Sequence, residues 1–238
     1  AWCCGFDISV SMKSRIFLDY ASATPVDPRV LEKMLPYFSD KFANPSSLYR
    51  SGKVARDAIE KARDQVAQAI GADSNEIIFT SGGTEANNLA ILGGAHAVSD
   101  ARKSIFTCRT EHQSVLQPCY FLENTGWKLS YLPLDLNGVV NLNDKDLFPE
   151  DLAFCSVMLV NNEIGVVQPI AEIAKQVKKK RALMYTDACQ ALGHVTINVK
   201  ALHLDLLTLN SGKIYGPKGV GALYIHKGTK LTPQAYGG

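Results

Sequence analysis

The chain has 238 residues, a formal net charge of +2, 46% hydrophobic residues and 20% charged residues. This composition is typical of a globular protein that buries a sizeable core, and the small net charge excludes nucleic acid as the default partner. No apolar run approaches the roughly 20 residues of a membrane-spanning helix, so we expect no membrane insertion. The first residues combine neither a basic region nor a long apolar region, so we expect no secretory signal.

The six cysteines are scattered along the chain, and none of them belongs to a CxxC pair. Apart from the adjacent Cys3 and Cys4, each lies in or beside an apolar segment. This distribution favours a reduced, cytoplasmic protein with buried thiols, and it predicts no metal site.

The predicted elements begin with a strand at residues 16–20 (IFLDY), which a proline-rich stretch follows. In residues 51–71, apolar side chains recur at helical spacing and Gly71 stands where a helix cap is expected, so this segment is predicted to be a helix. Further strands are predicted at residues 76–80, 104–108, 128–132, 152–160, 182–187, 204–209 and 220–225, and further helices at residues 84–97, 114–123 and 169–181.

Strands that alternate with helices and are almost continuously apolar indicate a parallel sheet covered on both faces. The predicted fold is therefore a three-layer α/β/α sandwich with a mainly parallel sheet. Ligands of such folds bind beyond the carboxyl ends of the strands. The polar residues that directly follow each strand are consequently the candidates for a site.

Three of these strand ends carry polar groups with two possible roles each. Gly83 and Thr84 follow residues 76–80 and could bind an anion at a helix start, or could form a plain turn capped by Thr84. His112 follows residues 104–108 and could be structural or catalytic. Asn162 follows residues 152–160 and could orient a ligand hydroxyl or close a turn.

The last two strand ends carry a carboxylate and an amine. Asp187 ends residues 182–187, with Gln190 close behind, and a buried carboxylate needs a partner such as a ligand cation or a backbone cap. Residues 204–209 lead into Asn210-Ser211-Gly212-Lys213. This is not a nucleotide-binding P-loop, because a leucine occupies the required glycine position and an isoleucine follows the lysine.

One ligand, pyridoxal phosphate, would satisfy all five strand ends. A lysine whose pKa is lowered by burial can form a Schiff base with its aldehyde. Its other groups would be met by Gly83, Thr84 and Ser211 at the phosphate, His112 at the ring face, Asn162 or Gln190 at the ring hydroxyl, and Asp187 at the ring nitrogen.

Several motifs resemble one family over about residues 16–238. These motifs are LDYASATPVDP, FANPSS, FTSGGTEANNLAI, TEHQSVL, VNNEIGVVQPI, TDACQALG and KIYGPKGVGALY. They resemble the class V aminotransferase-type enzymes that use pyridoxal phosphate, and within them the cysteine desulfurases of the NifS/IscS type. TSGGTEANN and VNNEIGVVQ are similar to the NifS/IscS branch rather than to the SufS-like branch.

The resemblance implies conversion of L-cysteine to L-alanine with an enzyme-bound persulfide, in a homodimer that passes sulfur to an acceptor such as an iron–sulfur scaffold protein. It implies a Schiff-base and proton-transfer role for Lys213, a ring-nitrogen contact for Asp187, ring-hydroxyl and substrate contacts for Gln190 and Asn162, ring stacking and proton transfer for His112, and phosphate contacts for Gly83 and Thr84. Where the family usually has Ser-Gly-His-Lys, this chain has Asn210-Ser211-Gly212-Lys213, so Ser211 is expected to supply the phosphate-binding hydroxyl.

The resemblance also implies a domain organisation. Residues 1–15 are expected to be an N-terminal extension, and residues 16–238 a cofactor-binding large domain. The family chain continues into a smaller C-terminal domain with the persulfide cysteine and a substrate-binding arginine. We therefore expect that this chain alone does not complete the desulfurase cycle. The alternatives are another class V reaction, such as that of an aminotransferase or a selenocysteine lyase, and a non-catalytic fragment that binds pyridoxal phosphate.

Overall fold

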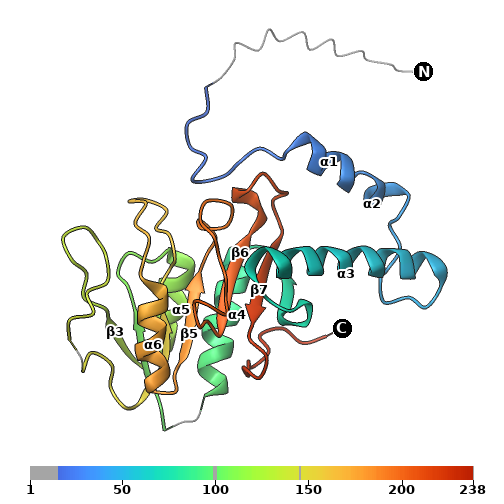
Figure 1. Ribbon diagram of the computed structural model, residues 1–238. Coiled ribbons are helices and arrows are strands. Elements are labelled where there is room, and N and C mark those ends of the chain that lie inside the picture. Colours follow the sequence, from blue (N-terminus) through green and yellow to red (C-terminus); the bar gives the residue numbers. More distant parts are fainter. Residues whose placement is uncertain (1–15, 99–100, 145, 238) are drawn as a thin grey trace.

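The computed structural model describes residues 16–98, 101–144 and 146–237. The expected N-terminal extension, residues 1–15, lies outside the described residues, as do Cys3 and Cys4. The strand predicted at residues 16–20 is wrong, because this segment is an exposed coil. Ile16 and Leu18 are 83% and 90% exposed. An apolar segment becomes a strand only where a neighbouring strand pairs with its backbone, and this segment lies away from the sheet (Figure 1).

The described residues form one seven-stranded sheet in the order β1-β7-β6-β5-β4-β2-β3. The five strands β6, β5, β4, β2 and β3 pair in parallel with their neighbours in the sheet. Strand β7 pairs antiparallel with both β6 and β1. The prediction of a mainly parallel sheet is thus confirmed. The strands are β1 (Ile77–Thr80), β2 (Ser104–Thr107), β3 (Lys128–Tyr131), β4 (Leu152–Ser156), β5 (Leu183–Asp187), β6 (Leu206–Asn210) and β7 (Gly221–Ile225).

Helices cover both faces of this sheet (Figure 1). Side chains alternate along the strands, so Phe154 packs in one core with α4 and α5, and the adjacent Cys155 packs in the other core with α3 and α6. The three-layer prediction is therefore confirmed. The helices are α1 (Pro28–Met34), α2 (Pro36–Ser39), α3 (Arg50–Ile70), α4 (Gly83–Ala97), α5 (Gln113–Asn124) and α6 (Ile170–Lys179), with the short 3-10 helices η1 (Ser74–Glu76) and η2 (Ser211–Lys213).

Helix α3 illustrates how a local pattern determines an element. Its apolar residues recur every three to four positions, and the helix ends at Gly71, which has a positive φ of 70° and lets its N–H reach the last carbonyl groups. Only the carboxyl-terminal part, with Ala67 and Ile70, joins the core under the sheet. The amino-terminal part projects past the sheet toward α1 and α2 (Figure 1).

The parallel strands end at one edge of the sheet, and this edge positions the polar residues. Strand β5 ends at Asp187, and β6 ends at Asn210 directly before η2 and Lys213. The loop from β1 into α4 reaches the same region, because α4 packs against β5 and β6. Within the described part of the chain, no helix is both long and apolar enough to cross a membrane.

Candidate active site

A cavity of about 110 Å³ lies at the carboxyl edge of the sheet. Residues that the sequence places more than 100 positions apart meet in it. Eight of the ten predicted site residues line it, namely Gly83, Thr84, His112, Asn162, Asp187, Gln190, Asn210 and Lys213. A neighbouring cavity of about 260 Å³ shares Gly83, Thr84 and Asn210 with it and is also lined by Gly212.

Asp187 is 4% exposed and accepts two hydrogen bonds from neutral donors. Its Oδ1 accepts from the backbone N–H of Cys189, and its Oδ2 accepts from the side-chain amide of Asn87, both at 2.8 Å. Because these donors carry no charge, they orient the carboxylate without neutralising it. A cationic ring nitrogen on a ligand would be stabilised beside such a group.

Lys213 reaches the cavity from η2, immediately after β6. The side chain of Asn210 caps this turn by accepting a hydrogen bond at 3.0 Å from the backbone N–H of Gly212. The turn brings a half-buried amine to the same cavity as Asp187 and His112. A lysine in this position can form a covalent bond with a carbonyl compound.

The start of α4 offers an anion site. Within the described structure the helix begins at Gly83 with no side-chain cap, so its first N–H groups remain open toward the two cavities. Gly82 has a φ of 153°, which favours glycine, and a Cβ on Gly83 would lie only 2.7 Å from the sulfur of Cys189. Glycine at both positions thus allows a phosphate group to approach the backbone.

Gln190 and Asn162 complete the polar lining. The Gln190 amide nitrogen donates to the carbonyl of Ala21 at 3.1 Å, while its Oε1 is buried and has no hydrogen-bond partner among the described residues. This free acceptor suits a ligand hydroxyl. The turn after β4 is closed by the neighbouring Asn161, whose Oδ1 accepts from the N–H groups of Glu163 and Ile164, so Asn162 is left facing the cavity.

His112 caps α5, and its ring lines the cavity. Its Nδ1 accepts from the backbone N–H of Ser114 at 3.1 Å and lies 2.7 Å from the hydroxyl of the same serine. The imidazole is therefore held in place by the first turn of the helix that follows it.

Four further residues that were not predicted from the sequence also line the cavity: Asn87, Ser114, Met158 and Cys189. Asn87 stands four positions after Gly83, one turn along α4, so helical spacing is the signal that could have found it. Ser114 stands two positions after His112 at the start of α5, where its side chain turns back toward the cap.

Ser211, whose hydroxyl was expected at a phosphate, is not among the described residues that line this cavity. Its hydroxyl instead contacts the carbonyl oxygens of Pro217 and, at 2.9 Å, Val220. Ser211 begins the 3-10 helix η2, and these contacts direct its hydroxyl toward the loop 217–220.

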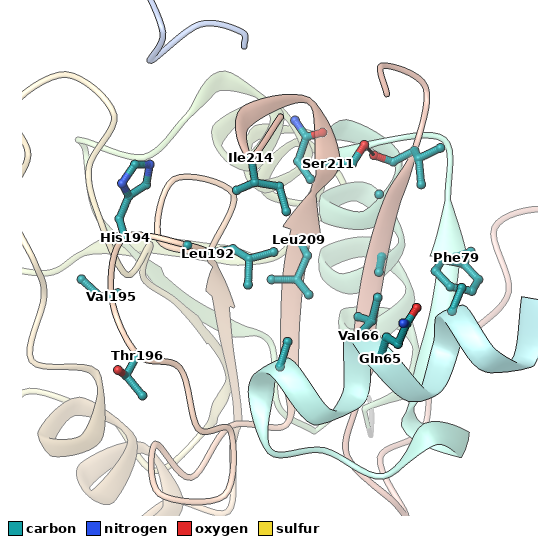
Figure 2. Close-up of a pocket in the computed structure, with 17 residues that line it drawn as sticks. Gln65, Val66, Phe79, Leu192, His194, Val195, Thr196, Leu209, Ser211 and Ile214 are labelled. Carbon is teal, nitrogen blue, oxygen red and sulfur yellow. Dashed lines mark hydrogen bonds between the residues drawn. The ribbon is translucent and has the colours of Figure 1, made fainter. Parts of the chain in front are cut away.

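A larger cavity of about 770 Å³ lies between α3, the strands β6 and β7, and the loop 192–196 (Figure 2). Apolar side chains such as Val66, Phe79, Leu192 and Leu209 line most of it, and Ser211 lies at one end. Among the described residues, no lysine, arginine, aspartate or glutamate lines it. The smaller cavity, which combines an amine, a carboxylate and an imidazole, is therefore the candidate active site.

The four cysteines within the described ranges are buried, as predicted. Burial raises the pKa of Cys119 to about 12 and raises the pKa values of Cys108, Cys155 and Cys189 above the ordinary range. A thiol with a raised pKa is a poor nucleophile, because the thiolate is the reactive form.

A mainly parallel α/β sheet with an amine, a carboxylate and an open helix start at its carboxyl edge defines an α/β protein with an enzyme-like site. Residues 16–238 match the model of the aminotransferase class-V family, and the chain belongs to this family. The family resemblance predicted from the motifs is thereby confirmed.

Curated relatives are similar to this chain over most of its length. The chain is 50% identical over 228 residues to a protein of Dictyoglomus turgidum named cysteine desulfurase IscS, covering 95% of this chain and 58% of that protein. It is 46% identical over 237 residues to cysteine desulfurase IscS of Methanosarcina thermophila, covering 99% of this chain and again 58% of the relative. The chain thus spans somewhat more than half the length of these relatives.

Solved structures share the fold. A NifS-like protein superposes with a TM-score of 0.91 at 37% identity, over 94% of this chain and 62% of that one. A structure described as SspA in complex with cysteine superposes with a TM-score of 0.90, also at 37% identity, over 94% of this chain and 65% of that one.

Proposed function

We propose that residues 16–238 form the cofactor-binding large domain of a cysteine desulfurase that depends on pyridoxal phosphate. The observation that carries this proposal is the single cavity in which Lys213, Asp187, His112 and the open start of α4 converge. The names of the relatives support the same reaction.

The residues present fit the cofactor. Asp187 would hold the ring nitrogen, and Gly83 and Thr84 at the start of α4 would hold the phosphate. The unpartnered Oε1 of Gln190 would accept a hydrogen bond from the ring hydroxyl, and Asn162 would lie beside it. When bound, pyridoxal phosphate withdraws electrons from the α-carbon of an amino acid and so makes its α-proton acidic.

Lys213 would bind the cofactor through Nζ and then move the α-proton of the substrate, L-cysteine. The products of the complete reaction would be L-alanine and a persulfide on a cysteine of the enzyme. The buried thiols of Cys108, Cys119, Cys155 and Cys189 do not suit that nucleophile. We further propose a cytoplasmic homodimer that delivers sulfur to an acceptor such as an iron–sulfur scaffold protein, as the resemblance to the NifS/IscS type implies.

Exchange of the α-proton of L-cysteine tests this function with the residues at hand. The protein loaded with pyridoxal phosphate is incubated with L-cysteine in heavy water, and deuterium in the recovered cysteine is measured by mass spectrometry. We expect deuterium incorporation with the unmodified chain and loss of it with Lys213→Ala, because the amine carries the proton.

Lys200→Ala is the matched control, because Lys200 pairs with Asp73 on the surface. A loaded protein that exchanges no α-proton would contradict the proposed function. Formation of a 2-oxo acid from the amino acid would favour the aminotransferase alternative.

A further inference from the structure

A continuous line of side-chain hydrogen bonds runs from the core to the imidazole of His112. The Tyr185 hydroxyl contacts the Oδ1 of Asn87 at 2.6 Å, and the Nδ2 of Asn87 donates to the Ser114 hydroxyl oxygen at 2.8 Å. That hydroxyl lies 2.7 Å from the Nδ1 of His112. Asn87 is 1% exposed and Tyr185 is fully buried, so solvent does not compete for the inner part of this line.

The amide of Asn87 has only one orientation that satisfies its neighbours. Its nitrogen donates to the Oδ2 of Asp187 at 2.8 Å, and the backbone N–H of Cys189 donates to the other oxygen of that side chain. The same nitrogen gives its second hydrogen to Ser114, which leaves Oδ1 to accept from the Tyr185 hydroxyl. Each donor and acceptor of this amide is therefore used in a fixed direction.

The direction of the remaining hydrogens follows. The Ser114 oxygen already accepts from Asn87, so its own hydrogen is free to point toward the Nδ1 of His112. The backbone N–H of Ser114 donates to the same Nδ1 at 3.1 Å. A ring nitrogen that accepts cannot carry the hydrogen, so a neutral His112 carries it on Nε2.

We propose that Asn87 and Ser114 are positioning residues that hold His112 as its Nε2–H tautomer, so that the neutral imidazole offers a hydrogen-bond donor to the active-site cavity. Capping of α5 explains the backbone hydrogen bond but not the buried amide and the hydroxyl behind it. Insofar as the cavity binds an amino acid, which rests on the proposed function, the Nε2–H of neutral His112 would donate a hydrogen bond to a developing anion and keep its proton, while Lys213 takes the α-proton.

The tautomer is measurable without cofactor or substrate. Long-range proton–nitrogen NMR correlations of the labelled protein, recorded where His112 is neutral, distinguish the protonated ring nitrogen from the bare one. We expect Nδ1 to be bare and Nε2 to be protonated. In Ser114→Ala and in Asn87→Ala, we expect the separation between the two nitrogen shifts to shrink toward that of a free imidazole.

Two neighbouring variants serve as matched controls. Asn88→Ala removes an amide that bonds the Thr84 carbonyl on the same helix, and Gln113→Ala removes one that bonds Gln117. Neither should alter the His112 signals. If Asn87→Ala does not fold, the half-buried Ser114 position still decides the question.

An Nδ1–H tautomer in the unmodified protein would overturn the proposal. An unchanged Nε2–H signature in both Ser114→Ala and Asn87→Ala would also overturn it, because the backbone N–H of residue 114 alone would then set the tautomer. Binding of pyridoxal phosphate is followed separately by its visible absorption. If pyridoxal phosphate does not bind but His112 has the expected tautomer, only the proposed function is contradicted. If pyridoxal phosphate binds but His112 has the Nδ1–H tautomer, only the positioning role is overturned.

Discussion

Glu111 is a buried acid, 5% exposed, behind the active-site cavity and one residue before His112. Its Oε1 accepts from the backbone N–H of Met158 at 2.7 Å, and its Oε2 has no hydrogen-bond partner among the described residues. Burial raises the pKa of Glu111 well above its ordinary value, and the nearby charge of Asp187 adds to this effect. Glu111 is therefore neutral under conditions in which an exposed glutamate is ionised.

Replacing Glu111 by glutamine should stabilise the protein increasingly as the pH rises. The folded state keeps a proton that the unfolded chain loses above its pKa of about 4.3, so the free energy of unfolding of the unmodified protein falls with rising pH. Glu111→Gln removes this loss, and we expect a gain on the order of 1–3 kcal/mol near neutral pH. Urea unfolding from about pH 5 to about pH 8 measures it.

Glu85→Gln is the contrasting control, because a hydrogen bond from Ser81 lowers the pKa of Glu85. Glu85 is therefore ionised in both the folded and the unfolded state above about pH 5, and its replacement should give a difference in stability that does not change over the measured range. A difference between Glu111→Gln and the unmodified protein that does not change with pH would show that Glu111 ionises normally.

The residues that carry the site were predictable to different degrees. Asp187 and Lys213 each directly follow an apolar run, and the parallel-sheet rule brings such positions together. Ser211 was expected at the cavity from its type and position, but the turn after β6 directs its hydroxyl to the Pro217 and Val220 carbonyl groups. Helical spacing from Gly83 could have suggested Asn87, but its contact with Ser114 is revealed only by the packing of α4 against α5.

At the scale of elements, β7 determines how closely the start of α4 approaches the sheet. Gly221 pairs with Thr80 at the end of β1, and a Cβ at this position would lie 2.6 Å from the carbonyl carbon of Gly82. Such a distance is shorter than any normal contact, so the backbone of one element would have to move. The anion site at α4 thus depends on a glycine in a strand that follows it by about 140 positions in the sequence.

Gly221→Ala should therefore lower both stability and phosphate binding. We expect a loss of about 1–3 kcal/mol in the free energy of unfolding, the usual cost of overpacking. Weaker binding of pyridoxal phosphate should accompany this loss. Urea unfolding and absorbance titration measure the two effects.

Gly212→Ala is the matched control, because a Cβ there meets only the Oδ1 of Asn210 at 3.6 Å and a carbon of Lys218 at 3.9 Å. It should leave stability nearly unchanged. Equal stability of Gly221→Ala and the unmodified protein would contradict the close approach of β7 to the turn before α4.

The elements themselves were largely readable from the sequence, since strong periodicity predicted α3 and alternation with apolar runs predicted the sheet. The strand expected at residues 16–20 failed because nothing pairs with it. Helices α1 and α2 were not predicted, although each begins at a proline, Pro28 and Pro36, a residue that suits the first helical position. Both are built of exposed and half-buried residues, so no apolar pattern marks them.

At the scale of the whole molecule, the N-terminal arm, residues 16–49, is tied to the turn that carries Lys213. The buried Thr24 donates its backbone N–H to the Gly212 carbonyl at 2.9 Å. Its hydroxyl contacts the same carbonyl at 3.1 Å and accepts from the N–H of Tyr215 at 2.8 Å. The arm therefore braces η2 from outside the sheet.

Thr24→Val should loosen both the arm and the lysine turn, because it leaves the Tyr215 N–H without its acceptor. We expect a loss of about 0.5–1.5 kcal/mol, the usual net contribution of one hydrogen bond. We expect faster amide hydrogen exchange in residues 16–49 and in residues 210–216. The central strands should keep their protection. Hydrogen exchange read by mass spectrometry measures this.

Ser22→Ala is the control, since the Ser22 hydroxyl bonds only the nearby Asp19 carbonyl at 2.9 Å. Faster exchange in the arm with no change in residues 210–216 would show that Thr24 does not brace the lysine turn.

The central claim is that Lys213 binds pyridoxal phosphate at the carboxyl edge of the sheet. The direct measurement adds pyridoxal phosphate to the protein, reduces the adduct with borohydride and maps the labelled lysine by mass spectrometry, with Lys213→Ala and Lys200→Ala in parallel. We predict a visible absorption band and a label on Lys213, both lost in Lys213→Ala and retained in Lys200→Ala. Absence of the band, or a label spread over surface lysines and unchanged in Lys213→Ala, would contradict the claim.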